Sequence, residues 1–136
     1  MGYLFPSKEW LNAFVIGLNN DEQYAEIAKN WEGDIVFAIM PDDKGGEAMY
    51  FYLDLWHGRC REGRVIDPME ISTVDPRYVL EATRSRFKSV LDGELDPMGA
   101  MVTRKLKVKG DLAYMLRNVP IVLDFVRCAQ EVGIEE

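Results

Sequence analysis

An aspartate, a histidine and a cysteine at intervals of three residues could, by type, form a nucleophilic triad: Asp54, His57 and Cys60. Such a triad works only when the histidine contacts both the thiol that it activates and the carboxylate that orients it. The segment around Asp54 is typical of a β-strand, in which successive side chains point to opposite faces. A strand through Asp54 and His57 would therefore place them on opposite sides of the sheet. We predict a histidine at a strand end, a cysteine in a turn, and no catalytic residue.

The other motifs that could support chemistry are also weak. Gly58 and Gly63 have the spacing of the glycines in a phosphate-binding loop, but Arg64 follows where that loop requires lysine. Acidic pairs such as Glu94 with Asp96 lie in turn-like segments, where acidic residues are common for backbone reasons. One histidine and two cysteines supply too few soft ligands for a zinc site. The sequence thus predicts that the protein is not an enzyme and has no metal and no cofactor.

Length and composition narrow the class of protein further. The chain has 136 residues, which fits a single domain over residues 1–136. Its net charge of −7 argues against nucleic-acid binding, which needs a positive surface to displace phosphate counterions. The longest clean apolar run, Ile35–Met40, is far shorter than the ~20 residues of a membrane-spanning helix. The cysteines fit reduced thiols, so we predict a cytoplasmic protein.

The hydrophobic pattern predicts helices near both ends of the chain and strands between them. Ser7 and Asn20 are predicted to cap two N-terminal helices, with Gln23 completing a capping box in the second. Strands are predicted at Asp34–Met40, Ala48–His57, Tyr78–Thr83 and Leu106–Lys109, with a further possible strand at Arg64–Ile66. Short helices are predicted at Ser85–Leu91 and from Pro97, and a last helix from Asp111 that breaks near Asn118 because of Pro120.

This order of elements favours an α+β fold, in which an antiparallel-rich sheet is covered by helices on one face. Residues 67–77 are predicted to be an irregular connection. Strand alternation separates two faces in the two clearest strands. The aliphatic and phenylalanine face is expected to meet the helices and contains Ile35, Phe37, Ile39, Phe51, Leu53 and Leu55. The other face carries Tyr50, Tyr52 and Trp56, which either form an exposed patch that a homodimer would hide or lie under a helix.

The C-terminal half is rich in methionine and other apolar side chains. Methionine adapts to irregular shapes, so these residues could line a pocket for a variable lipid or simply fill a core. Three basic clusters accompany them, formed by Arg59, Arg61 and Arg64, by Arg84, Arg86 and Lys88, and by Arg104, Lys105, Lys107 and Lys109. If two clusters converge they could touch anionic lipid head groups in a transient membrane contact. The alternative is a solvated face that balances the many acidic residues.

Residues 87–116 resemble the C-terminal signature of the sterol carrier protein-2 family. The matching pieces are Gly93-Glu94-Leu95-Asp96-Pro97, a short helix, and Arg104-Lys105-Leu106-Lys107-Val108-Lys109-Gly110-Asp111 before the final helix. The upstream order of helices and strands also matches. The sequence departs from the family in residues 67–77, which are longer and richer in proline, and in Pro120.

The resemblance implies a sheet of about five strands packed against helices around an apolar tunnel. It also implies non-catalytic binding and transfer of a sterol, a fatty acid, a fatty acyl-CoA or a phospholipid. The alternative is a protein-interaction module or accessory domain with the same fold that dimerises through the sheet. The residues expected to line the tunnel are Phe37, Ile39, Phe51, Leu53, Phe87, Leu91, Met98, Met101, Met115, Val119 and Leu123.

Overall fold

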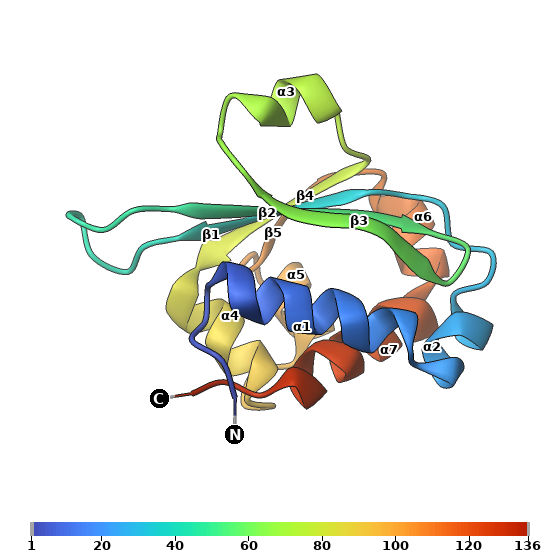
Figure 1. The fold of residues 1–136 in the computed structure, drawn as a ribbon. Helices are drawn as coiled ribbons and strands as arrows, with labels where there is room; N and C mark the ends of the chain where they lie inside the picture. The colour runs from blue at the N-terminus through green and yellow to red at the C-terminus, as the bar shows by residue number, and fades with distance from the viewer. Residues whose placement is uncertain (1, 136) are drawn as a thin grey trace.

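A five-stranded sheet forms the centre of the computed structural model, which describes residues 2–135 (Figure 1). The strand order is β3-β2-β1-β4-β5. Neighbouring strands are antiparallel, except that β1 and β4 are parallel. The fold is therefore α+β, as predicted, with one parallel pair in a mostly antiparallel sheet. The strands are β1 Ile35–Met40, β2 Met49–Trp56, β3 Arg59–Ile66, β4 Tyr78–Thr83 and β5 Lys107–Gly110.

Most of the helices pack under one face of this sheet, and one short helix stands on the other (Figure 1). Under the sheet lie α1 Lys8–Asn19, α2 Glu22–Ile27, α4 Arg84–Leu91, α5 Pro97–Val102 and α7 Val119–Val132. Helix α6, Leu112–Arg117, lies at one end of the sheet, and α3, Glu70–Val74, stands over the opposite face. The expectation of a wholly irregular connection at residues 67–77 was therefore wrong, because these residues contain α3.

Two N-terminal expectations also need correction. Asp21, not Asn20, caps α2, because its carboxylate accepts the Tyr24 backbone N–H at 2.9 Å. Gln23 completes no capping box, since its amide donates to Asp124 Oδ1 on α7 at 2.7 Å. Asn20 instead follows α1 and donates its backbone N–H to carbonyls of that helix. The start of α2 therefore lies one residue later than predicted, and the Gln23 side chain connects α2 to α7 by a hydrogen bond.

The third strand is longer than the sequence indicated. The turn before it consists of His57 and Gly58, which both have positive φ, 50° and 80°. Positive φ at both central residues is what a tight two-residue hairpin needs. A Cβ at Gly58 would also lie 2.5 Å from the Ala25 carbonyl oxygen, so only glycine fits there. Strand β3 therefore begins at Arg59 rather than at Arg64.

The last two helices meet where Pro120 predicted a break. Helix α6 ends at Arg117, and α7 begins at Val119 with Pro120 in its first turn. Proline is accepted there because the first N–H groups of a helix have no partner within it. The expected restart near Asn118 is confirmed. Among residues 2–135, no helix combines the length and the hydrophobicity needed to cross a bilayer.

The two ends of the described chain lie side by side (Figure 1). Tyr3 donates its backbone N–H to the Gly133 carbonyl at 3.3 Å and accepts the Glu135 N–H at 2.8 Å. Both segments lie beneath the sheet, next to α1 and α7. The first and last elements of the chain are therefore joined by backbone hydrogen bonds.

Candidate functional site

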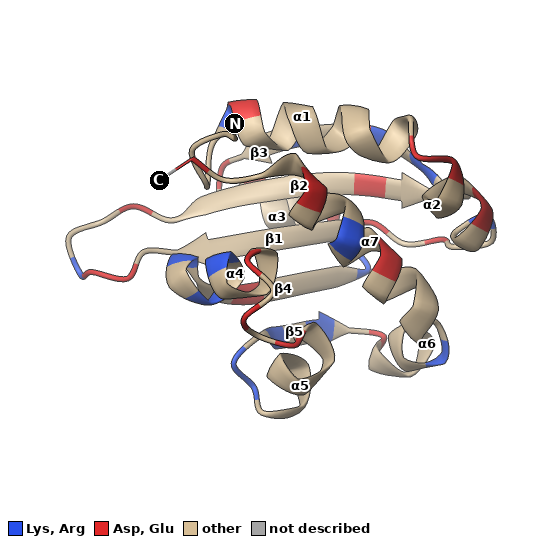
Figure 2. Cartoon of the chain, turned by 90° about the horizontal axis from the view of Figure 1, so that it is seen from below, with Lys and Arg blue, Asp and Glu red and all other residues tan. Residues whose placement is uncertain are grey.

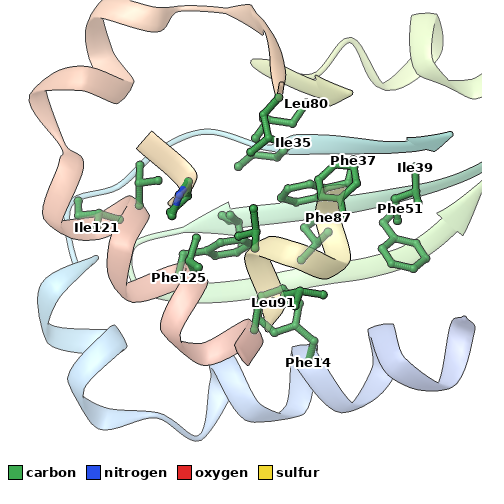
Figure 3. A pocket seen from close by; sticks show the side chains of 18 of the residues that line it. Phe14, Ile35, Phe37, Ile39, Phe51, Leu80, Phe87, Leu91, Ile121 and Phe125 are labelled. Atoms are coloured by element: carbon green, nitrogen blue, oxygen red, sulfur yellow. The ribbon is translucent and has the colours of Figure 1, made fainter. Parts of the chain in front are cut away.

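An apolar cavity lies between the sheet and the helices below it (Figure 3). Three strands supply its upper wall, and strand alternation brings only one face of each to it. The sheet residues that line it are Ile35, Phe37, Ile39, Phe51, Leu53, Leu55 and Leu80. All six side chains expected on the inner face of β1 and β2 are among them. The alternation read from the sequence is therefore confirmed.

Helices α1, α4, α5 and α7 supply most of the opposite wall, and α2 and α6 each add one residue. Phe87 and Leu91 of α4 lie below Phe37 in Figure 3, and Phe125 of α7 lies beside them. The rings of Phe37 and Phe125 are parallel with centroids 5.9 Å apart, and Phe87 meets Phe37 edge-on at 6.1 Å. The other helical lining residues are Trp10, Phe14, Tyr24, Val90, Pro97, Met101, Met115, Ile121, Val122, Val126 and Ala129. No lining side chain carries a charge at neutral pH.

The cavity has a volume of about 100 Å³. Phe37 shows that side chains do not fill this space completely. It sits on the central strand, and its neighbours Ile35 and Ile39 are buried, yet Phe37 keeps accessible surface. A side chain at the centre of a packed core would be covered, because protein interiors are close-packed. The cavity can therefore hold apolar atoms of a ligand, and no charged side chain lines it.

Comparison with known proteins decides which family this arrangement belongs to. Residues 12–122 match the SCP-2 sterol transfer family. The chain belongs to the SCP-2 sterol transfer family. A crystal structure of sterol carrier protein 2 superposes with a TM-score of 0.82 at 30% identity and covers 93% of this chain and 98% of that one. A solution structure of a Thermus thermophilus protein, described as possibly a sterol carrier protein, gives a TM-score of 0.83 at 29% identity over 98% and 93%.

Curated relatives of this SCP-2 chain are much longer than it is. Mouse (Mus musculus) stomatin-like protein 1 is 38% identical over 79 residues, which is 58% of this chain and 18% of that protein. The human (Homo sapiens) protein of the same name is 40% identical over 73 residues, or 54% of this chain and 17% of that protein. This chain thus matches less than a fifth of either relative.

Most of the residues expected to line an SCP-2 tunnel do line the cavity, namely Phe37, Ile39, Phe51, Leu53, Phe87, Leu91, Met101 and Met115. Three do not. Leu123 is 43% exposed, and Met98 and Val119 are half-buried outside the lining. The reason on α7 is helical phase, because Ile121, Val122, Phe125, Val126 and Ala129 form one stripe and Leu123 points away from it. Whether the lining residues contact lipid remains a prediction.

The residues of the possible triad are held apart. His57 Nε2 lies 2.6 Å from Glu32 Oε2, and Asp54 accepts from Arg61 at 3.0 Å. The Cys60 thiol donates to the Glu62 carbonyl at 3.3 Å. The three side chains therefore make these hydrogen bonds with different partners outside the triad. SCP-2 family proteins are in general carriers without catalytic activity, which agrees with this geometry.

Both thiols are expected to be unreactive in the folded protein. Burial raises the pKa of Cys60 to about 11 and that of Cys128 to about 12, so almost no thiolate exists at neutral pH. A disulfide reagent such as Ellman's should label neither cysteine in native protein at pH 8 and both in guanidinium chloride. Rapid labelling of one thiol in the native protein, at the rate of a free cysteine, would contradict the assignment of both as buried structural residues.

A cluster of charges fixes α2 against α7. The Arg127 guanidinium donates to Asp21 Oδ1 at 2.7 Å and to Asp124 Oδ1 at 2.8 Å, and Asp124 is only 6% exposed. The donor atoms of Asp21, Asp124 and Cys128 lie within 4.8 Å of one another, a spacing that would suit a metal ion. The Arg127 side chain already neutralises both carboxylates. The cluster is therefore an ion-pair network that holds two walls of the cavity together.

The outer face of the sheet carries the aromatic residues considered for dimerisation. Tyr52 donates to Asp34 at 2.8 Å, and the Arg64 guanidinium lies 5.7 Å from its ring centroid. The Arg61 guanidinium lies 4.6 Å from the Trp56 ring centroid, and the His57 ring stacks on Trp56. Arginine side chains thus lie against the rings of Tyr52 and Trp56, although Trp56 is still 37% exposed. Dimerisation through it remains a prediction.

Proposed function

We propose that this chain carries single-chain lipids by taking their hydrocarbon part into the cavity between the sheet and α7. The supporting observation is the composition of the wall, which is apolar on every side. Each methylene moved from water into such a space gains about 0.8 kcal/mol, so a few methylenes give useful affinity without a polar group. Membership of the SCP-2 family supports lipid binding and transfer in general.

The size of the cavity favours a slim ligand. A volume of about 100 Å³ is well below the roughly 300–1,000 Å³ of pockets that enclose drug-sized molecules. A short stretch of acyl chain fits such a space, whereas the rigid rings of a sterol need a much wider one. A longer chain requires α4, α5 or α7 to move outward. Apart from Phe37, the half-buried lining residues lie on these helices, among them Leu91, Met101 and Val126, so these helices form the side that opens.

The proposed carrier collects its lipid in a transient contact with an anionic membrane surface. Two of the basic clusters converge, because Arg86 on α4 donates to the Lys105 carbonyl at 3.5 Å. Figure 2 shows lysine and arginine on α4 and on the connection that leads to β5. The exposed Val102 ends the neighbouring helix, α5. Basic side chains beside an apolar one, next to the helices that open, suit a contact with anionic head groups.

The alternative function, a protein-interaction module that dimerises through the sheet, has less support. A stable interface needs an apolar centre, and arginine side chains lie against Tyr52 and Trp56 on this face. The longer curated relatives do favour an accessory role for such a domain within a larger protein. The single domain over residues 1–136 and a cytoplasmic location remain predictions.

Native mass spectrometry tests the proposed function directly. Protein purified without detergent or organic solvent is expected to carry lipid adducts that disappear on mild activation. Delipidated protein should bind a fluorescent fatty acid saturably at one site, and decanoic acid should displace the probe. A protein that carries no adduct and binds neither probe nor decanoic acid would rule out a lipid carrier.

A further inference from the structure

One buried nitrogen in the cavity wall has no hydrogen-bond partner. Among residues 2–135, Trp10 Nε1 is the one buried side-chain nitrogen or oxygen without a partner, and the Trp10 side chain lines the cavity. Trp31 also lines the cavity, but its indole N–H donates to the Gly33 carbonyl at 2.9 Å. Buried donors are nearly always satisfied, because an unsatisfied N–H has lost its water and gained nothing. Trp10, a residue of the wall, thus has an indole donor that no protein group uses.

Trp10 lies at a closed end of the cavity. Its ring meets Phe5 edge-on at 4.9 Å, Phe14 at 5.2 Å and Phe51 in a stacked arrangement at 6.2 Å between centroids. All four side chains are 5% exposed or less. Arg84 holds Phe5 in place by donating to its backbone carbonyl at 2.8 Å. The side formed by α4, α5 and α7 is nearer the surface, so a ligand that enters there meets Trp10 last.

We propose that Trp10 anchors the polar end of the ligand, with its indole N–H donating to an oxygen atom of a single-chain lipid bound head-inward. This inference rests on the proposed function, because it names the part of the ligand that reaches the closed end. An ordered oxygen there satisfies the donor, whereas a methyl end leaves it unpaired. A hydroxyl or a carboxyl group is small, whereas the head groups of phospholipids and acyl-CoA are far larger than a cavity of about 100 Å³ can enclose. The ligand class is therefore the fatty acids and fatty alcohols.

The chemistry of the wall also decides the protonation state of an acid. A bare carboxylate buried among apolar groups is very costly, so a fatty acid binds there in its neutral form. An alcohol needs no proton to do the same. Decanoic acid, 1-decanol and decane thus form a series with the same chain, in which only the first two can accept the Trp10 N–H.

Indole resonances report this hydrogen bond without a substitution. In ¹⁵N-labelled protein the Trp10 indole proton is expected to move downfield on binding 1-decanol or decanoic acid and to stay near its starting position with decane. Trp31 is the matched control, because it lines the same cavity with its N–H already bonded to Gly33. Trp56 on the outer face is a second control. Loss of one peak in Trp10→Phe assigns the resonance.

The Trp10→Phe variant supplies an affinity test. Phenylalanine keeps an aromatic ring and removes the unsatisfied donor, so the variant is expected to fold. Competition against a fluorescent fatty acid should show 1-decanol and decanoic acid weakened roughly three- to tenfold relative to decane, the loss of one hydrogen bond. Decane corrects for the smaller ring, because the changed shape of the wall affects all three ligands alike. The acid and alcohol arms separate a carboxyl from a hydroxyl as the group that Trp10 takes.

The outcomes separate this inference from the proposed function. A shift at Trp10 with the oxygen-bearing ligands alone, together with their selective loss in Trp10→Phe, supports it. The inference is overturned, while the carrier function stands, if all three ligands bind and decane gives the same Trp10 indole shift and the same affinity change in Trp10→Phe as decanoic acid and 1-decanol. If none of the three binds to wild-type protein, the proposed function fails and this inference with it.

Discussion

Replacing Val126 with phenylalanine is expected to weaken the binding of decanoic acid about 15- to 60-fold. Val126 lines the cavity from α7, and a phenyl ring at this position would occupy space that two or three methylenes of a ligand need. At about 0.8 kcal/mol for each methylene, their exclusion costs the ligand roughly 1.6–2.4 kcal/mol. Filling an apolar cavity does not expose any core side chain, so the melting temperature should stay level or rise. Fluorescent displacement and thermal unfolding measure the two effects.

Val102→Phe is the matched control for this substitution. Val102 lies at the end of α5, is 80% exposed and does not line the cavity. The same change of residue there should leave the affinity for decanoic acid within about twofold of wild type. Wild-type affinity in a folded Val126→Phe variant would show that the ligand occupies some other place, and would remove the cavity from the proposed function.

Replacing Arg127 with methionine is expected to lower the free energy of unfolding by about 3–5 kcal/mol. The change leaves the buried Asp124 carboxylate with only the Gln23 amide as a partner, and an uncompensated buried charge is costly. Domains of this kind are stable by about 5–15 kcal/mol, so the loss is a large part of the total. Urea unfolding followed by circular dichroism gives the value.

Lys29→Met provides the control, since Lys29 pairs with Glu26 on the surface and both side chains are mostly exposed. Removal of this pair should cost well under 1 kcal/mol. An equal cost for Lys29→Met and Arg127→Met would show that burial of Asp124 contributes nothing.

Acid should narrow the difference between wild type and Arg127→Met. The hydrogen bond from Arg127 holds the pKa of the Asp21 carboxyl below its usual value. A group whose pKa is lower in the folded state adds stability above its unfolded pKa and loses that stability as the pH falls through the folded pKa. The wild type therefore gives up this contribution on acidification, whereas the variant does not have it to lose.

The sheet side of the cavity could be predicted from the sequence, and the helical side only in part. Alternation with a period of two leaves one choice for β1, so Ile35, Phe37 and Ile39 had to share a face. On α7 apolar residues lie on more than one face of the helix, so the sequence pattern did not determine which face packs against the sheet. Leu123 was expected inside for that reason, and Phe125 was not.

The edge strand and Trp10 were missed for other physical reasons. Strand β3 lies at the edge of the sheet with charged side chains, among them Arg61, Glu62 and Arg64, and so lacks the hydrophobic signal of a buried strand. Trp10 has the spacing of an ordinary core residue of α1. Only coordinates reveal that its indole nitrogen has no partner, because residue types do not report the distance between a helix and a sheet.

The backbone pairing between Tyr3 and the segment at Gly133 to Glu135 brings the two ends of the described chain into contact. If these two segments were joined by a linker, the chain could be opened in an exposed loop, for example around Asp43 to Gly46, with the same arrangement of strands and helices. The order in which the segments are synthesised is therefore not what preserves the hollow beneath the sheet. That hollow depends on contacts between surfaces, which a circularly permuted protein would keep.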